Sequence, residues 1–91
     1  KSKFQHLTKQ ELLVYSTIYQ LEEEGFIVDY SSLAKKLSLT ESSIRDYVLR
    51  LLKKGIPLEK TKENNKKVFL KIPPHLKKIA SLQAILALKE L

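Results

Sequence analysis

The sequence predicts one small domain that is mainly α, within the α+β class: a three-helix core, then a β-hairpin, then an extra C-terminal helix. Three observations in its 91 residues predict this order. Apolar residues repeat at helical spacing up to Gly55, the pattern then changes to that of extended chain, and Pro73-Pro74 precedes a last apolar stretch. We therefore expect the core and hairpin in residues 7–72 and the extra helix in residues 73–91.

The first helix has signals at both ends. Thr8 is followed three residues later by Glu11, so the two side chains can satisfy two free backbone amides reciprocally as a capping box. Gly25 offers a stop, and the pattern predicts a helix over residues 9–24. Its apolar face consists of Val14, Ile18 and Leu21. The apolar run at 26–28 comes next, and its length leaves open a small strand or a buried connector.

Two short helices follow, each behind a capping residue. The side chain of Asp29 can accept hydrogen bonds from the free backbone amides at the start of a helix over residues 30–37. Thr40 can cap a third helix that ends before Gly55. Ser38 and the residue after it interrupt the helical pattern between the two. The third helix is expected to have an inner stripe of Ile44, Tyr47 or Val48, Leu51 and Leu52. The sequence thus predicts two helices joined by a tight turn.

After the third helix the sequence predicts a hairpin. Extended segments at 56–61 and 68–72 flank a polar run, in which Asn64-Asn65 can adopt the left-handed conformations that a hairpin turn requires. Pro57 has no amide to donate, so the first strand is expected to begin beyond it or to lie at an edge.

A last helix is expected over residues 75–90, because Pro73-Pro74 ends the hairpin and can open a helix. Its apolar residues lie on more than one side, whereas a helix that rests on one surface needs only a stripe. We therefore expect this helix to pack on the first helix and also to meet a second copy of the chain, which predicts a homodimer.

Basic residues are concentrated in the middle of the chain. The formal net charge is +7 overall, and it is −2 over residues 1–34, +7 over 35–71 and +2 over 72–91. Such an excess indicates nucleic acid or an acidic membrane surface as the partner. No stretch approaches the roughly 18 apolar residues of a membrane span, and the last helix has few basic residues, so we expect no membrane partner.

The sequence offers little for catalysis or for a cofactor. It has no cysteine, and its two histidines, His6 and His75, are far apart in the chain. It also lacks a glycine-rich phosphate loop, a nucleophile elbow and a paired acid motif. We expect a cytoplasmic protein that is not an enzyme and that binds no metal or other cofactor.

A resemblance to a known family rests on aliphatic and small residues in the two short helices. Those that match the helix-turn-helix pattern are Leu33, Ala34, Leu37, Leu39, Ile44 and Val48. With the basic hairpin behind them, residues 7–72 resemble the winged helix-turn-helix DNA-binding domains of bacterial and archaeal transcription regulators, with MarR-like and LexA-repressor-like amino-terminal domains nearest. The resemblance implies double-stranded DNA binding, with the third helix in the major groove and the hairpin as a basic wing.

Two departures from that family pattern stand in the sequence. Ser38 holds the turn position that is usually glycine, and Asp46 and Leu49 fall on the expected DNA-reading face of the third helix. Asp46 and Leu49 favour the alternative reading, a winged-helix module that binds another protein within a larger assembly.

Within the resemblance, helical spacing from Ile44 assigns the DNA contacts of the third helix, and the basic residues of the second helix and the wing are added to them. They comprise serines at the start of the third helix, two arginines for bases or phosphates, and lysines of the second helix, third helix and wing: Lys35, Lys36, Ser42, Ser43, Arg45, Arg50, Lys53, Lys60, Lys62, Lys66 and Lys67. For any single lysine, the alternative to a DNA contact is a charge that is simply solvated. Tyr47 is expected either to stack on a base or to border the core.

Overall fold

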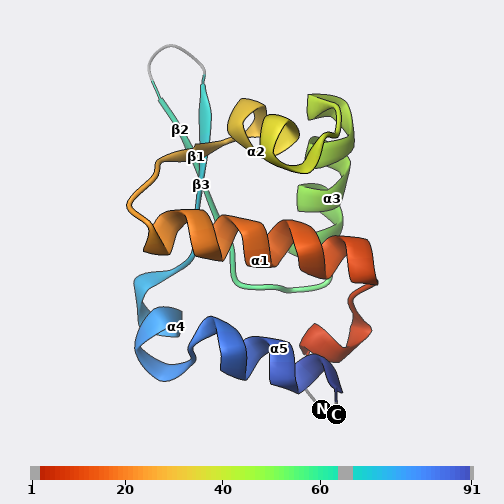
Figure 1. The fold of residues 1–91 in the computed structure, drawn as a ribbon, viewed down its shortest axis with the longest axis vertical. Helices are drawn as coiled ribbons and strands as arrows, with labels where there is room; N and C mark the ends of the chain where they lie inside the picture. Colours follow the sequence, from red (N-terminus) through yellow and green to blue (C-terminus); the bar gives the residue numbers. More distant parts are fainter. Residues whose placement is uncertain (1–2, 64–66, 91) are drawn as a thin grey trace.

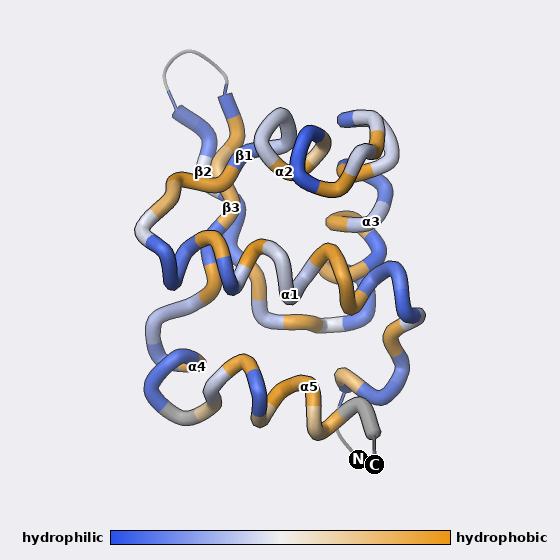
Figure 2. The backbone as a smooth tube through the Cα atoms, viewed as in Figure 1, coloured by the Kyte–Doolittle hydropathy of each residue, from blue (hydrophilic) through white to orange (hydrophobic). Residues whose placement is uncertain are grey.

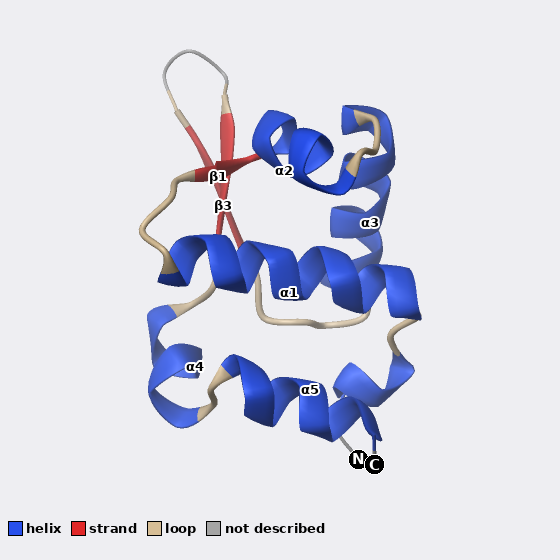
Figure 3. Cartoon of the chain, viewed as in Figure 1, coloured by secondary structure: helices blue, strands red, loops and turns tan. Residues whose placement is uncertain are grey.

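The computed structural model describes residues 3–63 and 67–90. Helix α1 crosses the middle of the molecule, with α2, α3 and the sheet on one side and α4 and α5 on the other (Figure 1). The elements are the 3-10 helix η1 (Lys3–His6), α1 (Lys9–Glu23), β1 (Val28–Asp29), α2 (Tyr30–Leu37), α3 (Glu41–Lys53), β2 (Glu59–Lys62), β3 (Val68–Lys71), α4 (Pro74–Ile79) and α5 (Leu82–Glu90). Figure 3 shows that helices dominate and that the strands form one small sheet. The expected α+β class is confirmed.

The capping signals of the first two helices are formed as the sequence predicts. Thr8 Oγ1 accepts from the Glu11 amide at 3.1 Å, and Glu11 Oε1 accepts from the Thr8 amide at 2.9 Å. At α2, Asp29 Oδ1 accepts from the Ser32 amide at 2.7 Å. Because each bond joins residues only three apart, local sequence is enough to fix where these helices begin.

A tight turn joins α2 to α3. Ser38 adopts a left-handed backbone, with φ 56° and ψ 43°, in a region that favours glycine. Thr40 then caps α3, and its Oγ1 accepts from the Ser43 amide at 3.0 Å. The buried stripe of α3 is Ile44, Val48 and Leu51. Of the two alternatives for the inner position, Val48 therefore points into the core and Tyr47 is half-buried at its border.

Strand β1 and the hairpin form one antiparallel sheet in the order β1-β3-β2. In β1, Val28 lies opposite Leu70 of the central strand. The hairpin strand β2 begins two residues beyond Pro57, as the missing amide predicts. The expected turn at Asn64-Asn65 lies outside the described residues.

The apolar run at 26–28 is split between two environments. Val28 is buried and pairs with β3, whereas Phe26 and Ile27 are 60% and 77% exposed. Gly25, at φ 88°, turns the chain around the end of α1 before it reaches the sheet. The first two apolar side chains therefore lie outside the core, and a buried connector is the wrong description of them.

The prediction of one continuous helix over residues 75–90 is wrong, because the chain forms α4 and α5 with a break between them. Ala80 has extended backbone there, at φ −149° and ψ 119°, and its carbonyl accepts from the Tyr19 hydroxyl at 2.9 Å. The Ser81 hydroxyl accepts from the Ala84 amide at 3.1 Å at the start of α5. The break lets α5 lie along η1 and α1, where Ile85 is completely buried.

One apolar core connects the helices and the sheet. Figure 2 shows apolar residues recurring along α1, α3 and α5 between hydrophilic ones. Completely or almost completely buried members from different elements are Ile18, Leu33, Ile44, Leu70 and Ile85. Within residues 3–63 and 67–90, no helix combines the length and the apolarity needed to cross a membrane.

An ion pair between a half-buried lysine and a buried carboxylate ties the N-terminal segment to the end of α3. Glu11, whose side chain is 2% exposed, lies with Oε1 2.6 Å from Lys54 Nζ. Lys54 also donates to the carbonyl of His6 at 3.0 Å. Burial raises the pKa of Glu11, but the hydrogen bonds from Lys54 and the Thr8 amide outweigh it and hold the pKa below its ordinary value. Sequence reasoning missed this pair because its members are 43 residues apart.

Candidate nucleic-acid interface

The outer face of α3 carries five of the expected contact residues. Ser42, Arg45, Arg50 and Lys53 are exposed, and Ser43 is half-buried. The Ser43 hydroxyl accepts from Thr40 Oγ1 at 2.9 Å, so it belongs to the N-cap of the helix. At about 100° per residue, Arg45 and Arg50 lie roughly 140° apart around the helix axis. The two arginines therefore face different parts of any surface that α3 approaches.

Arg45 is held toward the sheet. Its guanidinium lies 5.1 Å from the centroid of the Tyr30 ring and 3.5 Å from Glu41 Oε1. Both side chains of this ion pair are about half exposed, which makes the pair weak and easily replaced by another anion. The i,i+4 spacing of Glu41 and Arg45 was a signal in the sequence that would have found the pair.

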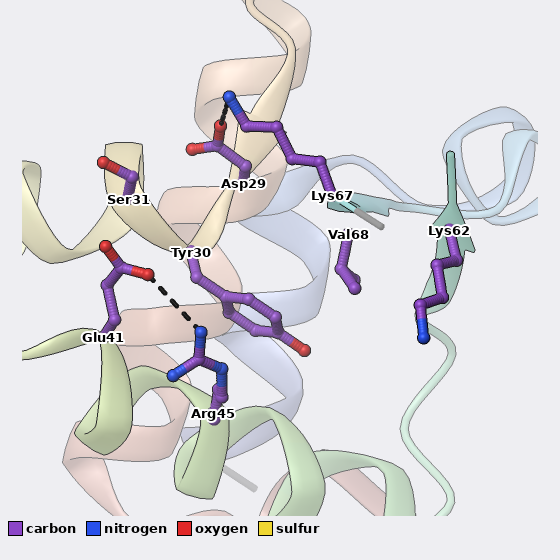
Figure 4. Close-up of a pocket in the computed structure, with 8 residues that line it drawn as sticks. All are labelled: Asp29, Tyr30, Ser31, Glu41, Arg45, Lys62, Lys67 and Val68. Carbon is purple, nitrogen blue, oxygen red and sulfur yellow. Dashed lines mark ion pairs between the residues drawn. The ribbon is translucent and has the colours of Figure 1, made fainter. Parts of the chain in front are cut away.

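A groove lies between the first turns of α2 and α3 and the hairpin, with a volume of about 310 Å³. We call it the hairpin groove, and its lining residues are Asp29, Tyr30, Ser31, Glu41, Arg45, Lys62, Lys67 and Val68. Figure 4 shows Arg45 entering from α3, with Lys62 and Lys67 on the hairpin side and the Tyr30 ring between. The fold thus gathers three of the predicted cations around one groove, although they are separated by up to 22 residues in the sequence.

The two lysines of this groove differ in their partners. Lys67 Nζ lies 3.1 Å from Asp29 Oδ2, so the hairpin is tied to the N-cap of α2. Burial raises the pKa of Asp29, but the hydrogen bonds from the Ser32 amide and from Lys67 outweigh it and keep the pKa below its ordinary value. The side chain of Lys62 makes no hydrogen bond or ion pair with the described residues, although its backbone pairs with β3. Lys62 is thus available to an added anion, whereas Lys67 must share its charge with Asp29.

The remaining predicted lysines are distributed around the molecule. Lys60 is exposed on β2, and Lys66 falls outside the described residues. Lys35 and Lys36 line a different groove, beside the turn between α1 and β1. The structure therefore does not bring these two lysines together with Arg45 and Lys62.

Further side chains modify the outer face of α3. The Arg50 guanidinium lies 5.3 Å from the centroid of the half-buried Tyr47 ring, which holds it against the helix. Leu49 is 50% exposed and Asp46 is exposed, so an apolar and an acidic side chain interrupt the basic surface. Among the described residues there is no group of three side chains able to hold a metal ion.

No family model, no curated protein and no solved structure matches the chain in comparisons with known proteins. A function for this chain must therefore be inferred from the geometry and charge of its own residues.

Proposed function

We propose that the chain is a cytoplasmic winged-helix domain that binds double-stranded DNA, as a transcription regulator or as part of one. In this proposal α3 enters the major groove and the β2–β3 hairpin acts as the wing. The observation that carries the proposal is the convergence of Arg45, Lys62 and Lys67 on the hairpin groove, next to the exposed arginine and lysine of α3. A single phosphodiester strand that passes this groove meets cations from both elements.

The order of the elements supports the winged-helix assignment. The chain runs α1, β1, α2, α3 and then the hairpin, and the hairpin pairs through β3 with β1. The sheet therefore fixes the hairpin relative to the N-terminus of α2, and the Lys67–Asp29 ion pair adds a second connection. These two connections hold the base of the hairpin beside the start of α2.

The residues of the interface divide into two roles. Arg50 and Arg45 are the candidates for base edges, because a guanidinium can donate two parallel hydrogen bonds to guanine. Lys60, Lys62 and Lys53 are the candidates for phosphates, which position the protein without reading the sequence. On binding, a base edge replaces Glu41 as the partner of Arg45, since their exposed ion pair contributes little to stability.

A salt titration with mixed-sequence duplex DNA tests the proposal. Log affinity should fall linearly with log salt, with a slope of about −0.9 for each phosphate neutralised. The basic groups on α3 and the hairpin predict a slope that corresponds to several phosphates. Undetectable binding to duplex DNA at low salt would reject the proposal.

Substitutions then separate the two roles. At a cognate site obtained by selection from a random duplex pool, Arg50→Ala or Arg45→Ala should cost about 1 to 3 kcal/mol and relax sequence preference. Lys62→Ala or Lys66→Ala should weaken binding to DNA of every sequence by the same factor. Lys78→Ala is the matched control, because it removes the same charge from α4, on the other side of α1. Equal losses on cognate and random DNA for every variant would indicate purely electrostatic binding.

A second candidate function is a protein-interaction module that uses the outer face of α3. The observation that favours it is the exposure of Leu49 and Asp46 at the centre of that face. The same titration distinguishes the two functions, because a module of this kind does not bind duplex DNA. In that case Leu49→Ser should weaken the binding of a protein partner.

A homodimer through the C-terminal helix is part of the first proposal. Two copies would place their α3 helices about one DNA turn, roughly 34 to 36 Å, apart. In α5, Ile85 is buried in the core, and Leu82 and Leu88 are half-buried against it. The half-buried Leu86, with the exposed Ala84 and Ala87, is the surface that a second copy would cover.

A further inference from the structure

A second groove lies on the flank of α2, at the turn between α1 and β1. Its volume is about 390 Å³, and we call it the Phe26–Ile27 groove. It is lined by Leu21, Phe26, Ile27, Ser32, Lys35 and Lys36. It shares no lining residue with the hairpin groove.

The two apolar side chains at its edge are unusually exposed. Phe26 is 60% and Ile27 77% exposed, the highest values among the large apolar side chains whose exposure the structure describes. Isolated exposed apolar residues are common on proteins, but two adjacent ones beside an apolar groove form a patch of the kind that marks a binding site.

The backbone presents this pair in a fixed position. The Phe26 amide donates to the Leu21 carbonyl and the Gly25 amide to the Glu22 carbonyl, each at 3.0 Å, which is the bonding pattern of a Schellman motif. That motif accounts for an apolar residue at position 26, which contacts the last turn of the helix, but it does not account for Ile27. A patch held by hydrogen bonds loses little conformational entropy when a partner covers it.

Two cations form the rim of the groove. Lys35 and Lys36 are exposed, and neither makes an ion pair with an acidic side chain of the described residues. The only other polar lining residue, Ser32, uses its hydroxyl in bonds with the Asp29 backbone. The groove therefore offers an apolar floor and a purely positive rim.

This charge pattern selects among possible occupants. A second copy would bring like charges together across the contact, in a chain whose net charge is already +7. Duplex DNA would satisfy the lysines but would leave Phe26 and Ile27 against a polar backbone. An acidic peptide with apolar side chains satisfies both parts of the surface.

We propose that the Phe26–Ile27 groove is a docking site for an acidic amphipathic segment of another protein. An apolar side chain of the segment packs on Phe26 and Ile27, and its carboxylates pair with Lys35 and Lys36. A helix that lays its apolar face into the groove is the mode that fits an open apolar floor with a charged rim. Because the two grooves share no lining residue, binding at this groove can be tested separately from the DNA proposal.

Peptide display tests this inference. The full chain is immobilised and a random library of roughly 15-residue peptides, about four helical turns, is selected on it. The expected winners combine Leu or Phe at helical spacing with Asp and Glu. The double variant Phe26→Ser, Ile27→Ser should lower their affinity by about tenfold or more, as for a central apolar anchor. Lys35→Ala with Lys36→Ala should lower affinity several-fold and flatten its salt dependence.

Matched controls make the outcomes decisive. Leu13→Ser removes an exposed apolar side chain elsewhere, and Lys78→Ala removes a charge elsewhere, so both variants should bind the peptides normally. The Phe26→Ser, Ile27→Ser variant should bind duplex DNA with unchanged salt slope, so failure of one proposal does not imply failure of the other. Peptides without acidic residues, equal binding to the groove variants, or an absence of enrichment would overturn the inference. Binding of the patch to phosphatidylglycerol vesicles in place of peptides would overturn it in favour of a membrane surface.

Discussion

Replacement of Lys54 by methionine removes the cation that faces an almost completely buried carboxylate. Glu11 is 2% exposed and Lys54 Nζ lies 2.6 Å from its Oε1. After the substitution, Glu11 keeps the hydrogen bond from the Thr8 amide at 2.9 Å but loses its counter-charge. Methionine retains most of the length of the lysine side chain, so the change removes charge more than packing.

The magnitude follows from the burial of the two partners. Leaving one member of a fully buried ion pair unpaired costs about 3 to 5 kcal/mol. The cost here is smaller, because the Thr8 amide still supports the carboxylate and the Lys54 side chain is 33% exposed, which gives water access to the vacated site. We expect a loss of about 2 kcal/mol at pH 7. For a domain of this size that lowers Tm by roughly 8 to 16 °C.

The loss should depend on pH in a defined direction. In the parent protein the pKa of Glu11 is below its ordinary value of 4.5, so its contribution is present above pH 4.5 and is lost as pH falls through the lower folded-state value. In Lys54→Met, the hydrogen bond and the charge of Lys54 no longer lower the pKa of Glu11, so this pKa rises. Because Lys54 stabilises only the ionised carboxylate, the difference between the two proteins should be largest at pH 7 and should shrink toward pH 4.

Urea unfolding followed by circular dichroism at pH 7 and pH 4 measures these differences. Lys53→Met is the control, because Lys53 is the exposed neighbour and should lose little at either pH. Glu11→Gln in the Lys54→Met background should recover part of the loss, since an amide can still accept from Thr8 without carrying a charge. An equal loss at pH 7 and pH 4, with no recovery from Glu11→Gln, would refute the reasoning.

Three further predictions concern the α2 caps and the assembly. Asp29→Ala removes the α2 cap and the partner of Lys67, and should cost about 1 to 2 kcal/mol in urea unfolding at pH 7. The cost should decrease below pH 3.8, because the folded protein holds the Asp29 pKa under that value. If Asp29→Ala left the urea midpoint unchanged at pH 7, Asp29 would not stabilise α2 as its cap. Ser38→Gly should stabilise by about 0.5 to 1 kcal/mol, since Ser38 has φ 56°, and a lowered Tm would show that its side chain has another role. Light scattering should give the mass of a dimer, and a monomer at all accessible concentrations would remove the expected role of α5.

Several parts of the fold could be predicted because their causes are local. The capping hydrogen bonds at the starts of α1, α2 and α3 join residues three apart. The starts of these helices can therefore be predicted from Thr8, Asp29 and Thr40. The start of β2 follows from the missing amide of Pro57, and the tight turn at Ser38 follows from the interruption between two apolar patterns. In the candidate interface, the exposure of Arg45 and Arg50 follows from helical spacing alone.

Other parts depended on contacts between distant segments. The break at Ala80 has no proline or glycine to mark it, and it coincides with a hydrogen bond from Tyr19, 61 residues earlier in the chain. The expected roles of Lys35 and Lys36 rested on their charge, whereas their position beside Phe26 and Ile27 depends on how α1 turns into the sheet.

The sequence by itself determined the class of the fold, the starts of its first three helices and the concentration of positive charge in residues 35–71. Tertiary structure decided which of those charges act together: Arg45 and Lys62 share the hairpin groove, Lys67 is paired with Asp29, and Lys35 and Lys36 face a separate apolar patch. The physical reason is range. Caps and helical periodicity act over three or four residues, whereas the neighbours of a surface charge are set by packing between elements that are far apart in the chain.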